Sequence, residues 1–112
     1  MKAAQKLSIY VEETEKFEGR PVYEVLMEIF RKRGIAGVSV FRGVAGYGEH
    51  RVFHTAKILE LATSMPLKIE AVDSAEMIQA VLPEVCKVVG RGLVEVSDTL
   101  IVKSPAGSGE GE

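Results

Sequence analysis

Residues 21–34 read PVYEVLMEIFRKRG, and their apolar positions repeat with the period of an α-helix. Aliphatic and aromatic side chains recur three and four positions apart and form one continuous stripe, which is typical of a helix that packs on one side: Val22, Val25, Leu26, Ile29 and Phe30. Pro21 suits the first turn, where its missing N–H has no partner to lose. The basic run Arg31–Arg33 complements the negative end of the helix dipole, and Gly34 supplies the left-handed stop.

Segments of alternating apolar and polar residues lie on both sides of this helix. Alternation is the pattern of strands with one buried face, and the strands predicted on this ground are residues 7–11, 35–42, 67–72 and 94–102. The charged segment Glu12–Gly19 is expected to be a loop, whereas Val52–Met65 fits either period and stays a partly ordered connection.

A second helix is predicted between the third and fourth strands. Asp73 and Glu76 form a D-x-x-E pair, which is typical of a helix N-terminus. An apolar stripe of helical spacing follows, made of Ile78, Val81, Leu82, Val85 and Val89. Pro83 is expected to kink this helix or to restart it one turn later, and Gly90–Gly92 should end it.

The order of elements is β-α-β-β-α-β, the split arrangement of ferredoxin-like α+β domains. Both helices should cover one face of a four-stranded antiparallel sheet, because their stripes need a single apolar surface to pack against. The other face carries Tyr10 and Phe41 among polar residues, and we expect an oligomer interface there.

A chain of 112 residues fits one domain, predicted over residues 1–103, and the glycine- and glutamate-rich residues 104–112 are expected to be a disordered tail. The net charge of −2 does not recruit nucleic acid or an anionic membrane. No apolar run reaches the roughly 20 residues that span a bilayer, and Met1–Lys6 lacks the apolar core of a signal peptide. We therefore expect a cytoplasmic protein without nucleic-acid partners or membrane insertion.

The residues available for catalysis are few: one cysteine and two histidines. Cys86 lies among valines and is expected to be a small buried hydrophobe. The acidic residues Glu12, Glu13 and Glu15 are expected to be solvated, since no base or nucleophile lies nearby in the sequence. Binding without catalysis is the favoured function, and an enzyme acting in a cleft between subunits remains an alternative.

A glycine-rich segment, Gly43–Gly48, separates the second strand from the polar run Glu49–Arg51. Glycines allow concave backbone conformations whose N–H groups can approach an anion. His50 and His54 are four positions apart and could bind a metal if that stretch were helical, but a site needs further ligands. No metal is therefore assigned, and the alternative function is a metal-binding homeostasis trimer, similar to CutA-like trimers, that uses the two histidines.

Taken together, several segments resemble the uncharacterised PII-like proteins, a family known only as a domain of unknown function. The resemblance covers Lys6 to Lys103. The segments that carry it are Leu7–Val11, Gly43–Gly48, His54-Thr55, Met65-Pro66, Val72-Asp73 and Gly92–Val96.

The resemblance implies a ferredoxin-like subunit that forms a homotrimer, with the sheets packed inward. In PII proteins the loop after the second strand reaches protein partners, and nucleotides bind between subunits near its base and near the turn before the last strand. The matching positions here are Gly43–Arg51 and Gly90–Gly92. This chain departs from PII proteins in having a shorter turn, without their longer glycine- and lysine-containing loop, and in lacking the sequence around their uridylylated tyrosine.

The expected function is thus a regulatory protein that binds a small anionic ligand and signals through the loop after the second strand. The resemblance also suggests an adenine nucleotide as regulatory ligand, without any cofactor, and an ion-transport protein as partner. Phosphate or carboxylate groups would be bound by arginine side chains and by the glycine-rich backbone. The predicted ligand residues are Arg42, Gly46, Tyr47, Gly48, Arg51 and Arg91.

Overall fold

A computed structural model of the chain describes residues 1–47, 54–55 and 64–105. The elements that build the main sheet and its cover are β1 (Lys2–Glu12), α1 (Val22–Lys32), β4 (Val38–Arg42), β7 (Pro66–Asp73), α2 (Ala75–Val88) and β8 (Leu93–Ile101). Two small hairpins complete the fold: β2 (Lys16–Phe17) with β3 (Arg20–Pro21), and β5 (Ala45–Gly46) with β6 (His54–Thr55). The predicted β-α-β-β-α-β order is confirmed.

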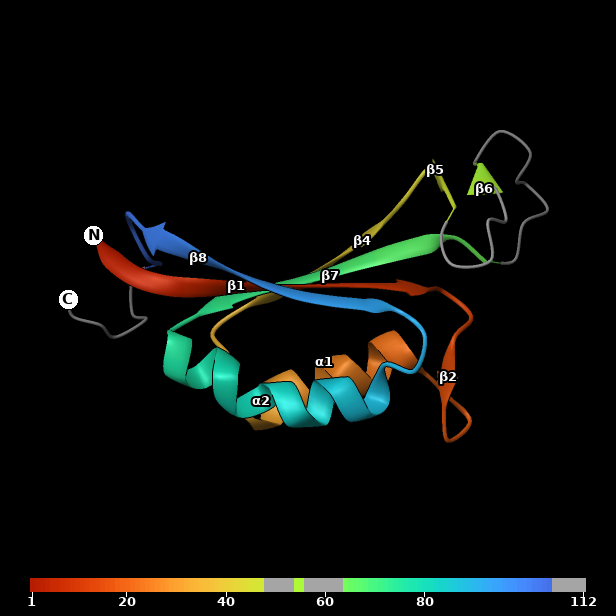
Figure 1. The fold of residues 1–112 in the computed structure, drawn as a ribbon, viewed down its shortest axis with the longest axis horizontal. Coiled ribbons are helices and arrows are strands. Elements are labelled where there is room, and N and C mark those ends of the chain that lie inside the picture. Colours follow the sequence, from red (N-terminus) through yellow and green to blue (C-terminus); the bar gives the residue numbers. More distant parts are fainter. Residues whose placement is uncertain (48–53, 56–63, 106–112) are drawn as a thin grey trace.

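The main sheet has the strand order β4-β7-β1-β8, and every neighbouring pair is antiparallel. Both helices lie against one face of it, and the other face is open (Figure 1). The register places Ile9 opposite Ile69 on one side and Val94 on the other. Because directly opposed residues share a face, this row of apolar side chains points toward the helices.

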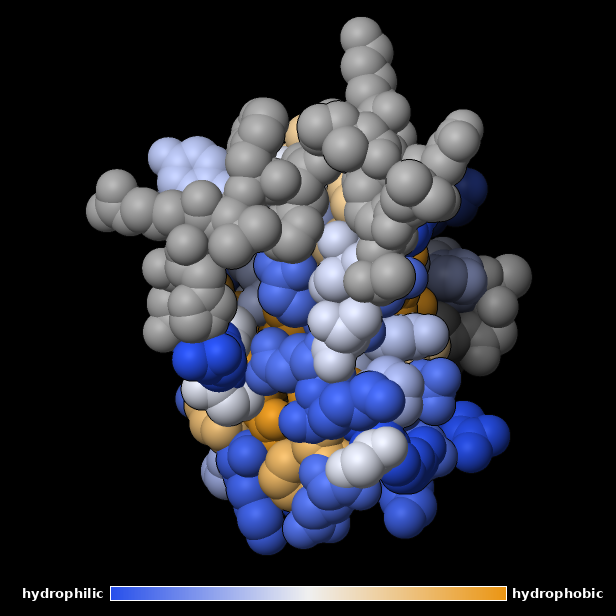
Figure 2. All heavy atoms as spheres, turned by 90° about the vertical axis from the view of Figure 1, so that its right-hand side faces the viewer, coloured by the Kyte–Doolittle hydropathy of each residue, from blue (hydrophilic) through white to orange (hydrophobic). Residues whose placement is uncertain are grey.

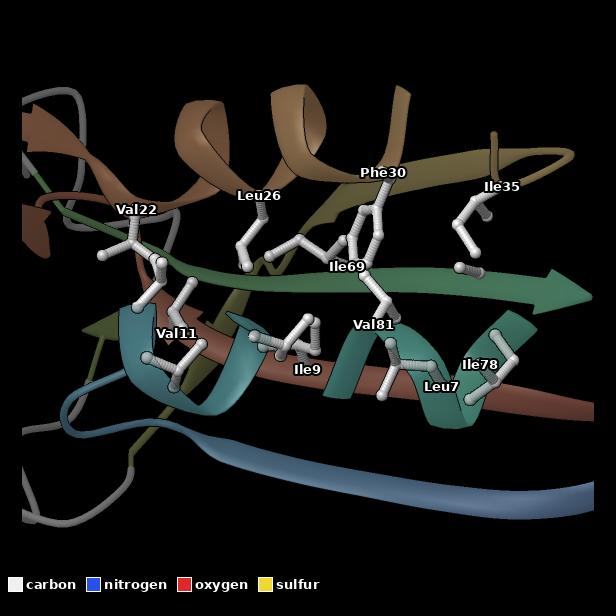
Figure 3. Packing of buried hydrophobic residues seen from close by; sticks show 14 of the residues in the cluster. Leu7, Ile9, Val11, Val22, Leu26, Phe30, Ile35, Ile69, Ile78 and Val81 are labelled. Carbon is white, nitrogen blue, oxygen red and sulfur yellow. The ribbon is translucent and has the colours of Figure 1, made fainter. Parts of the chain in front are cut away.

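Side chains from both helices and the sheet form one core (Figure 3). Val22, Leu26 and Phe30 of α1 are buried to 1% exposure or less, as the apolar stripe predicts. The helix ends in a Schellman motif: Gly34 N donates to Arg31 O at 3.2 Å, and the next residue's N–H donates to Phe30 O at 3.0 Å. The φ of +77° at Gly34 is the left-handed stop expected there.

Two local predictions at the helices are wrong, and a third is narrowed. Pro21 is the residue before α1 and pairs within the β2–β3 hairpin, so it does not lie inside the first turn. The side-chain cap of α2 is Ser74, whose Oγ accepts from Met77 N at 3.2 Å, and Asp73 is the last residue of β7. The helix α2 does not restart at Pro83, since it runs from Ala75 to Val88 as one element, and the alternative of a kink there stays a prediction.

The cysteine and the acidic loop also differ from expectation. Cys86 is exposed, because it follows Val85 on the helix and therefore points about 100° away from the buried stripe. Residues 16–19 were expected to belong to a loop, but they lie in the β2–β3 hairpin of residues 16–21, whose turn residues Glu18 and Gly19 have φ of +50° and +83°. Of the predicted tail, residues 106–112 lie outside the described part.

The open face of the sheet carries the aromatic side chains predicted for it. The register aligns Phe41, Lys68, Tyr10 and Leu93 in one row across all four strands. Phe41 is 51% exposed and Leu93 is 56% exposed. Between them, Lys68 Nζ lies 3.2 Å from Glu70 Oε2 and 5.8 Å from the centre of the Tyr10 ring. The hydrogen bond and the charge of Glu70 raise the pKa of Lys68, so its ammonium stays protonated.

Candidate ligand-binding site

The described ligand residues predicted from the sequence lie near one end of the sheet, where the ends of all four strands meet. There β1 ends at Glu12, β4 ends at Arg42, and β7 and β8 begin at Pro66 and Leu93. This end is on the right in Figure 1, together with the β2 hairpin, β5 and the connection from α2 to β8. Figure 2 looks onto it and shows mostly hydrophilic side chains below the grey residues.

Four of the six predicted ligand residues lie in the described part of the chain. Arg42 ends β4, Gly46 belongs to β5, Tyr47 follows it, and Arg91 lies in the turn between α2 and β8. The Tyr47 side chain is 66% exposed, and the Gly46 main chain pairs with His54. The other two, Gly48 and Arg51, lie outside the described residues.

The two groups of predicted residues are joined by a segment that the sequence did not single out for binding, Glu12–Glu15. We call it the acidic segment. Glu13 ties it to the end of β4, because Arg42 Nε donates to Glu13 Oε1 at 3.1 Å. The same oxygen accepts from Met65 N at 3.2 Å, and Glu13 N donates to Met65 O at 2.9 Å. Glu13 therefore holds both chain ends of the connection that begins after Arg42.

Two further contacts strengthen this side of the acidic segment. Ser64 Oγ donates to Glu12 Oε1 at 3.1 Å and accepts from Thr14 Oγ1 at 3.0 Å. Together with the Glu13 contacts, they attach the acidic segment to residues 64–65 through side chains and main chain. The prediction of a solvated acidic loop is wrong here, because these carboxylates are half-buried acceptors of structural hydrogen bonds.

The last residue of the acidic segment, Glu15, reaches the opposite side of the site. Its Oε2 accepts from Gly90 N at 3.2 Å and from Arg91 N at 3.3 Å. Its main chain is fixed independently, since Glu15 N donates to Glu12 O at 3.0 Å and Val22 N donates to Glu15 O at 2.9 Å. The carboxylate therefore reaches the turn from a main chain that is itself fixed by two hydrogen bonds.

Glycines at the two edges of the site are required by packing. A Cβ atom at Gly92 would overlap the main-chain carbonyl oxygen of Tyr10, so this turn lies directly against the end of β1. A Cβ atom at Gly43 would lie 2.9 Å from Pro66 Cγ, and Gly43 N donates to Pro66 O at 2.7 Å. At Gly92 the space left by the missing side chain is therefore taken by the protein's own strand.

The two histidines of the alternative metal site lie mainly outside the described part of the chain. His50 is not among the described residues, and of His54 only the main chain of β6 is described. Among the residues that the structure does describe, no group of three or more His, Cys, Asp or Glu side chains could hold a metal ion. Within the same residues, no helix has the length and hydropathy needed to cross a membrane.

Comparisons with known sequences agree with this picture. The model of the DUF190 family, described as "Uncharacterized ACR, COG1993", matches residues 4–101. A UPF0166 protein of Methanocaldococcus jannaschii is 38% identical over 101 residues, which cover 89% of this chain and 93% of that protein. A UPF0166 protein of Aquifex aeolicus is 36% identical over 96 residues, covering 86% and 90% of the two chains.

Two solved structures with this fold are PII-like proteins. One is CPII, a nitrogen regulatory PII-like protein of Thiomonas intermedia K12 bound to ADP, AMP and bicarbonate; it is 18% identical, with a TM-score of 0.66 and 90% of each chain covered. Another is a putative PII-like signaling protein of Thermus thermophilus, 15% identical with a TM-score of 0.65, covering 90% of this chain and 91% of that one. Likenesses of this kind establish a PII-like, ferredoxin-like fold.

Proposed function

The chain belongs to the DUF190 family, and from this premise we propose that it is a PII-like regulatory protein that binds an adenine nucleotide between subunits of a homotrimer. In this proposal the nucleotide is a regulatory ligand, and the protein does not turn it over. The signal passes through the connection after β4 to a protein partner, for which an ion-transport protein is our candidate. The cytoplasm is the compartment in which we expect this to happen.

One observation carries the proposal. The acidic segment forms hydrogen bonds with both regions in which the resemblance predicts ligand contacts. Glu13 binds Arg42 at the base of the connection after β4, and Glu15, two residues later, binds the turn that contains Arg91. Two regions far apart in the sequence are thereby brought to one end of the sheet. Arginine guanidinium groups and a glycine-flanked turn are suited to phosphate, and the fold neighbour CPII binds ADP and AMP.

The open face of the sheet supports the trimer. Phe41, Tyr10 and Leu93 are 51%, 39% and 56% exposed in one row. Exposed aromatic and aliphatic groups gathered on a face without a covering layer are typical of an interface. If three copies pack these faces together, the strand ends at the site of one subunit lie beside the next subunit, and the ligand binds in the cleft between them.

Calorimetric titration with ADP, AMP and adenosine tests the nucleotide proposal. We expect ADP to bind, and Arg91→Ala to weaken it about 10- to 100-fold, because a hydrogen bond to a charged group contributes about 1.5–3 kcal/mol. Arg31→Ala is the matched control, since Arg31 is an exposed residue in the last turn of α1 and should leave affinity unchanged.

Three results would contradict the proposal. The first is the absence of heat with any nucleotide at millimolar concentration, and the second is equal ADP affinity in Arg91→Ala and the wild type. The third concerns catalysis: ADP incubated with the protein should be recovered unchanged, and release of AMP or phosphate would make the protein an enzyme. Light scattering at the titration concentration checks the mass of the assembly at the same time.

A further inference from the structure

The turn between α2 and β8 already binds an anion, and that anion is part of the protein. Consecutive main-chain N–H groups of Gly90 and Arg91 converge on one oxygen, Glu15 Oε2, at 3.2 and 3.3 Å. Successive N–H groups that converge in this way form the concave sites at which proteins bind phosphate and carboxylate oxygens. We call this pair of N–H groups the anion seat.

The main chain next to the anion seat packs tightly against β1. Gly92, the next residue, lies so close to the carbonyl oxygen of Tyr10 that no side chain fits, which fixes the turn against β1. On the side that faces Glu15 the turn has room, because among the described residues, apart from its chain neighbours, a Cβ atom at Gly90 would meet only Glu15 Oε2 within 4 Å, at 3.9 Å. The carboxylate is therefore the group in closest reach of the seat on that side.

We infer that Glu15 is a built-in competitor for the anion seat, and that an anionic group of the ligand binds there only by displacing the Glu15 carboxylate. This inference rests on the proposed function for the identity of the physiological ligand. Two anions cannot share the pair of N–H groups, since charges of the same sign a few ångströms apart repel each other. Displacement is feasible because, within the described part of the chain, the carboxylate is held at this turn by two hydrogen bonds, of 3.2 and 3.3 Å.

A direct consequence concerns the charge of the ligand. A group that binds to the anion seat must compete with a carboxylate of the same chain. A multiply charged phosphate is therefore favoured over a singly charged or neutral ligand. Removing the competitor should raise the affinity for such an anion by about tenfold, the value of one hydrogen bond to a charged group. It should leave the affinity for adenosine unchanged.

The test titrates inorganic pyrophosphate into ¹⁵N-labelled full-length protein and follows the amide signals of Gly90 and Arg91. The variant is Glu15→Gln, which keeps the size of the side chain, removes its charge and leaves the main-chain bonds of residue 15 in place. The matched control is Glu24→Gln, since Glu24 is an exposed acid in the first turn of α1 and its loss changes the net charge equally. In Glu15→Gln the two signals should respond at about tenfold lower pyrophosphate than in the wild type or in Glu24→Gln.

Two results would overturn the inference: equal pyrophosphate affinity in Glu15→Gln and wild type, or binding that shifts other amides and leaves those of Gly90 and Arg91 in place. A parallel ADP titration separates the two proposals. If ADP binds no variant while pyrophosphate behaves as expected, the anion seat stands and the nucleotide proposal fails. If ADP needs Arg91 but binds Glu15→Gln and the wild type equally, the competitor is refuted and the nucleotide proposal stands.

Discussion

Replacing Gly92 by alanine should destabilise the protein far more than the same replacement at Gly90, on the other side of Arg91. At Gly92 the new Cβ would overlap the Tyr10 carbonyl oxygen and lie 2.8 Å from Val11 Cγ1. A Cβ atom essentially never lies within 3.0 Å of another unbonded heavy atom. Either the turn or the end of β1 must therefore move. At Gly90 the new Cβ would be in ordinary contact with Glu15 at 3.9 Å.

The size of the effect follows from where the movement occurs. Tyr10 is opposite Leu93 in the pairing of β1 with β8, so the displacement opens the end of that ladder. Overpacking costs about 1–3 kcal/mol, and loss of one ladder hydrogen bond adds about 1 kcal/mol, for a total of about 2–4 kcal/mol. Gly90→Ala should instead be neutral or stabilising by up to about 1 kcal/mol, because alanine lowers the entropy of the unfolded chain.

Thermal and urea unfolding followed by circular dichroism measure both variants. A difference of about 3 kcal/mol corresponds to a gap on the order of 10–20 °C between their melting midpoints for a domain of this size. All samples must have the same protein concentration, because association stabilises the folded state by mass action. Midpoints within about 3 °C of each other would refute the argument that contact with β1 constrains residue 92.

Three further variants test other parts of the structure. Ser74→Ala removes the acceptor for Met77 N–H and should lower the free energy of unfolding by about 1 kcal/mol; an unchanged urea midpoint would contradict the assignment of the cap. Hydrogen bonding to Arg20, with its charge, lowers the pKa of Glu28. The pair therefore stabilises the fold above the ordinary pKa of a glutamate, and this contribution is lost as pH falls through the lowered one. Arg20→Gln should raise the midpoint of the Glu28 carboxyl in an NMR titration, and equal midpoints would refute the coupling. Phe41→Ser should leave the monomer folded, because the ring is on the open face, but should reduce the mass seen by light scattering; a trimer of wild-type mass at low micromolar concentration would argue against that face as the interface.

The parts of the fold with long periodic patterns were predictable from the sequence. Eleven residues of α1 and eight of β7 each repeat the signal several times, so single exceptions do not matter. The hairpin of β2 and β3 was missed because strands of two residues have no period to detect. Its turn also departs from the usual Asn-Gly or Asp-Gly signal, since Glu18 occupies the first left-handed position.

A prediction displaced by one residue assigns the wrong role to an individual side chain. Moving the cap of α2 from Asp73 to Ser74 frees the Asp73 carboxylate for another role: Oδ2 accepts from Ala36 N at 2.9 Å and so joins the end of β7 to the segment before β4. For Cys86 the adjacent valines in the sequence were misleading. On a helix the relevant neighbours are three and four positions away, and the buried stripe passes through Val85 and Val88.

The acidic segment could not have been found by residue type. Glu15 is bound by main-chain N–H groups 75 and 76 positions away, and every residue except proline carries such a group. The partners of Glu13 at residue 65 are also main-chain atoms, 52 positions away. The strand order was the only available signal, because the end of β1, in the middle of the sheet, lies between the ends of β7 and β8. The ligand roles assigned to the arginines and to the glycine-rich segment stay predictions.

The central position of β1 also determines which contacts the displacement of Glu15 affects. If a ligand displaces Glu15 from the anion seat, the acidic segment loses its contact with the turn before β8 but keeps those of Glu13 with Arg42 and Met65. Glu13 and Glu15 are close in the chain, and the main-chain bond from Glu15 N to Glu12 O makes that interval a tight turn. Because the main chain of residue 15 is held by Glu12 O and Val22 N, the Glu15 carboxylate can leave the seat by rotation of its side chain, while Glu13 keeps its contacts at the start and the end of the connection after β4. Displacement of Glu15 would therefore release the turn before β8 and leave the contacts of Glu13 with Arg42 and Met65 in place.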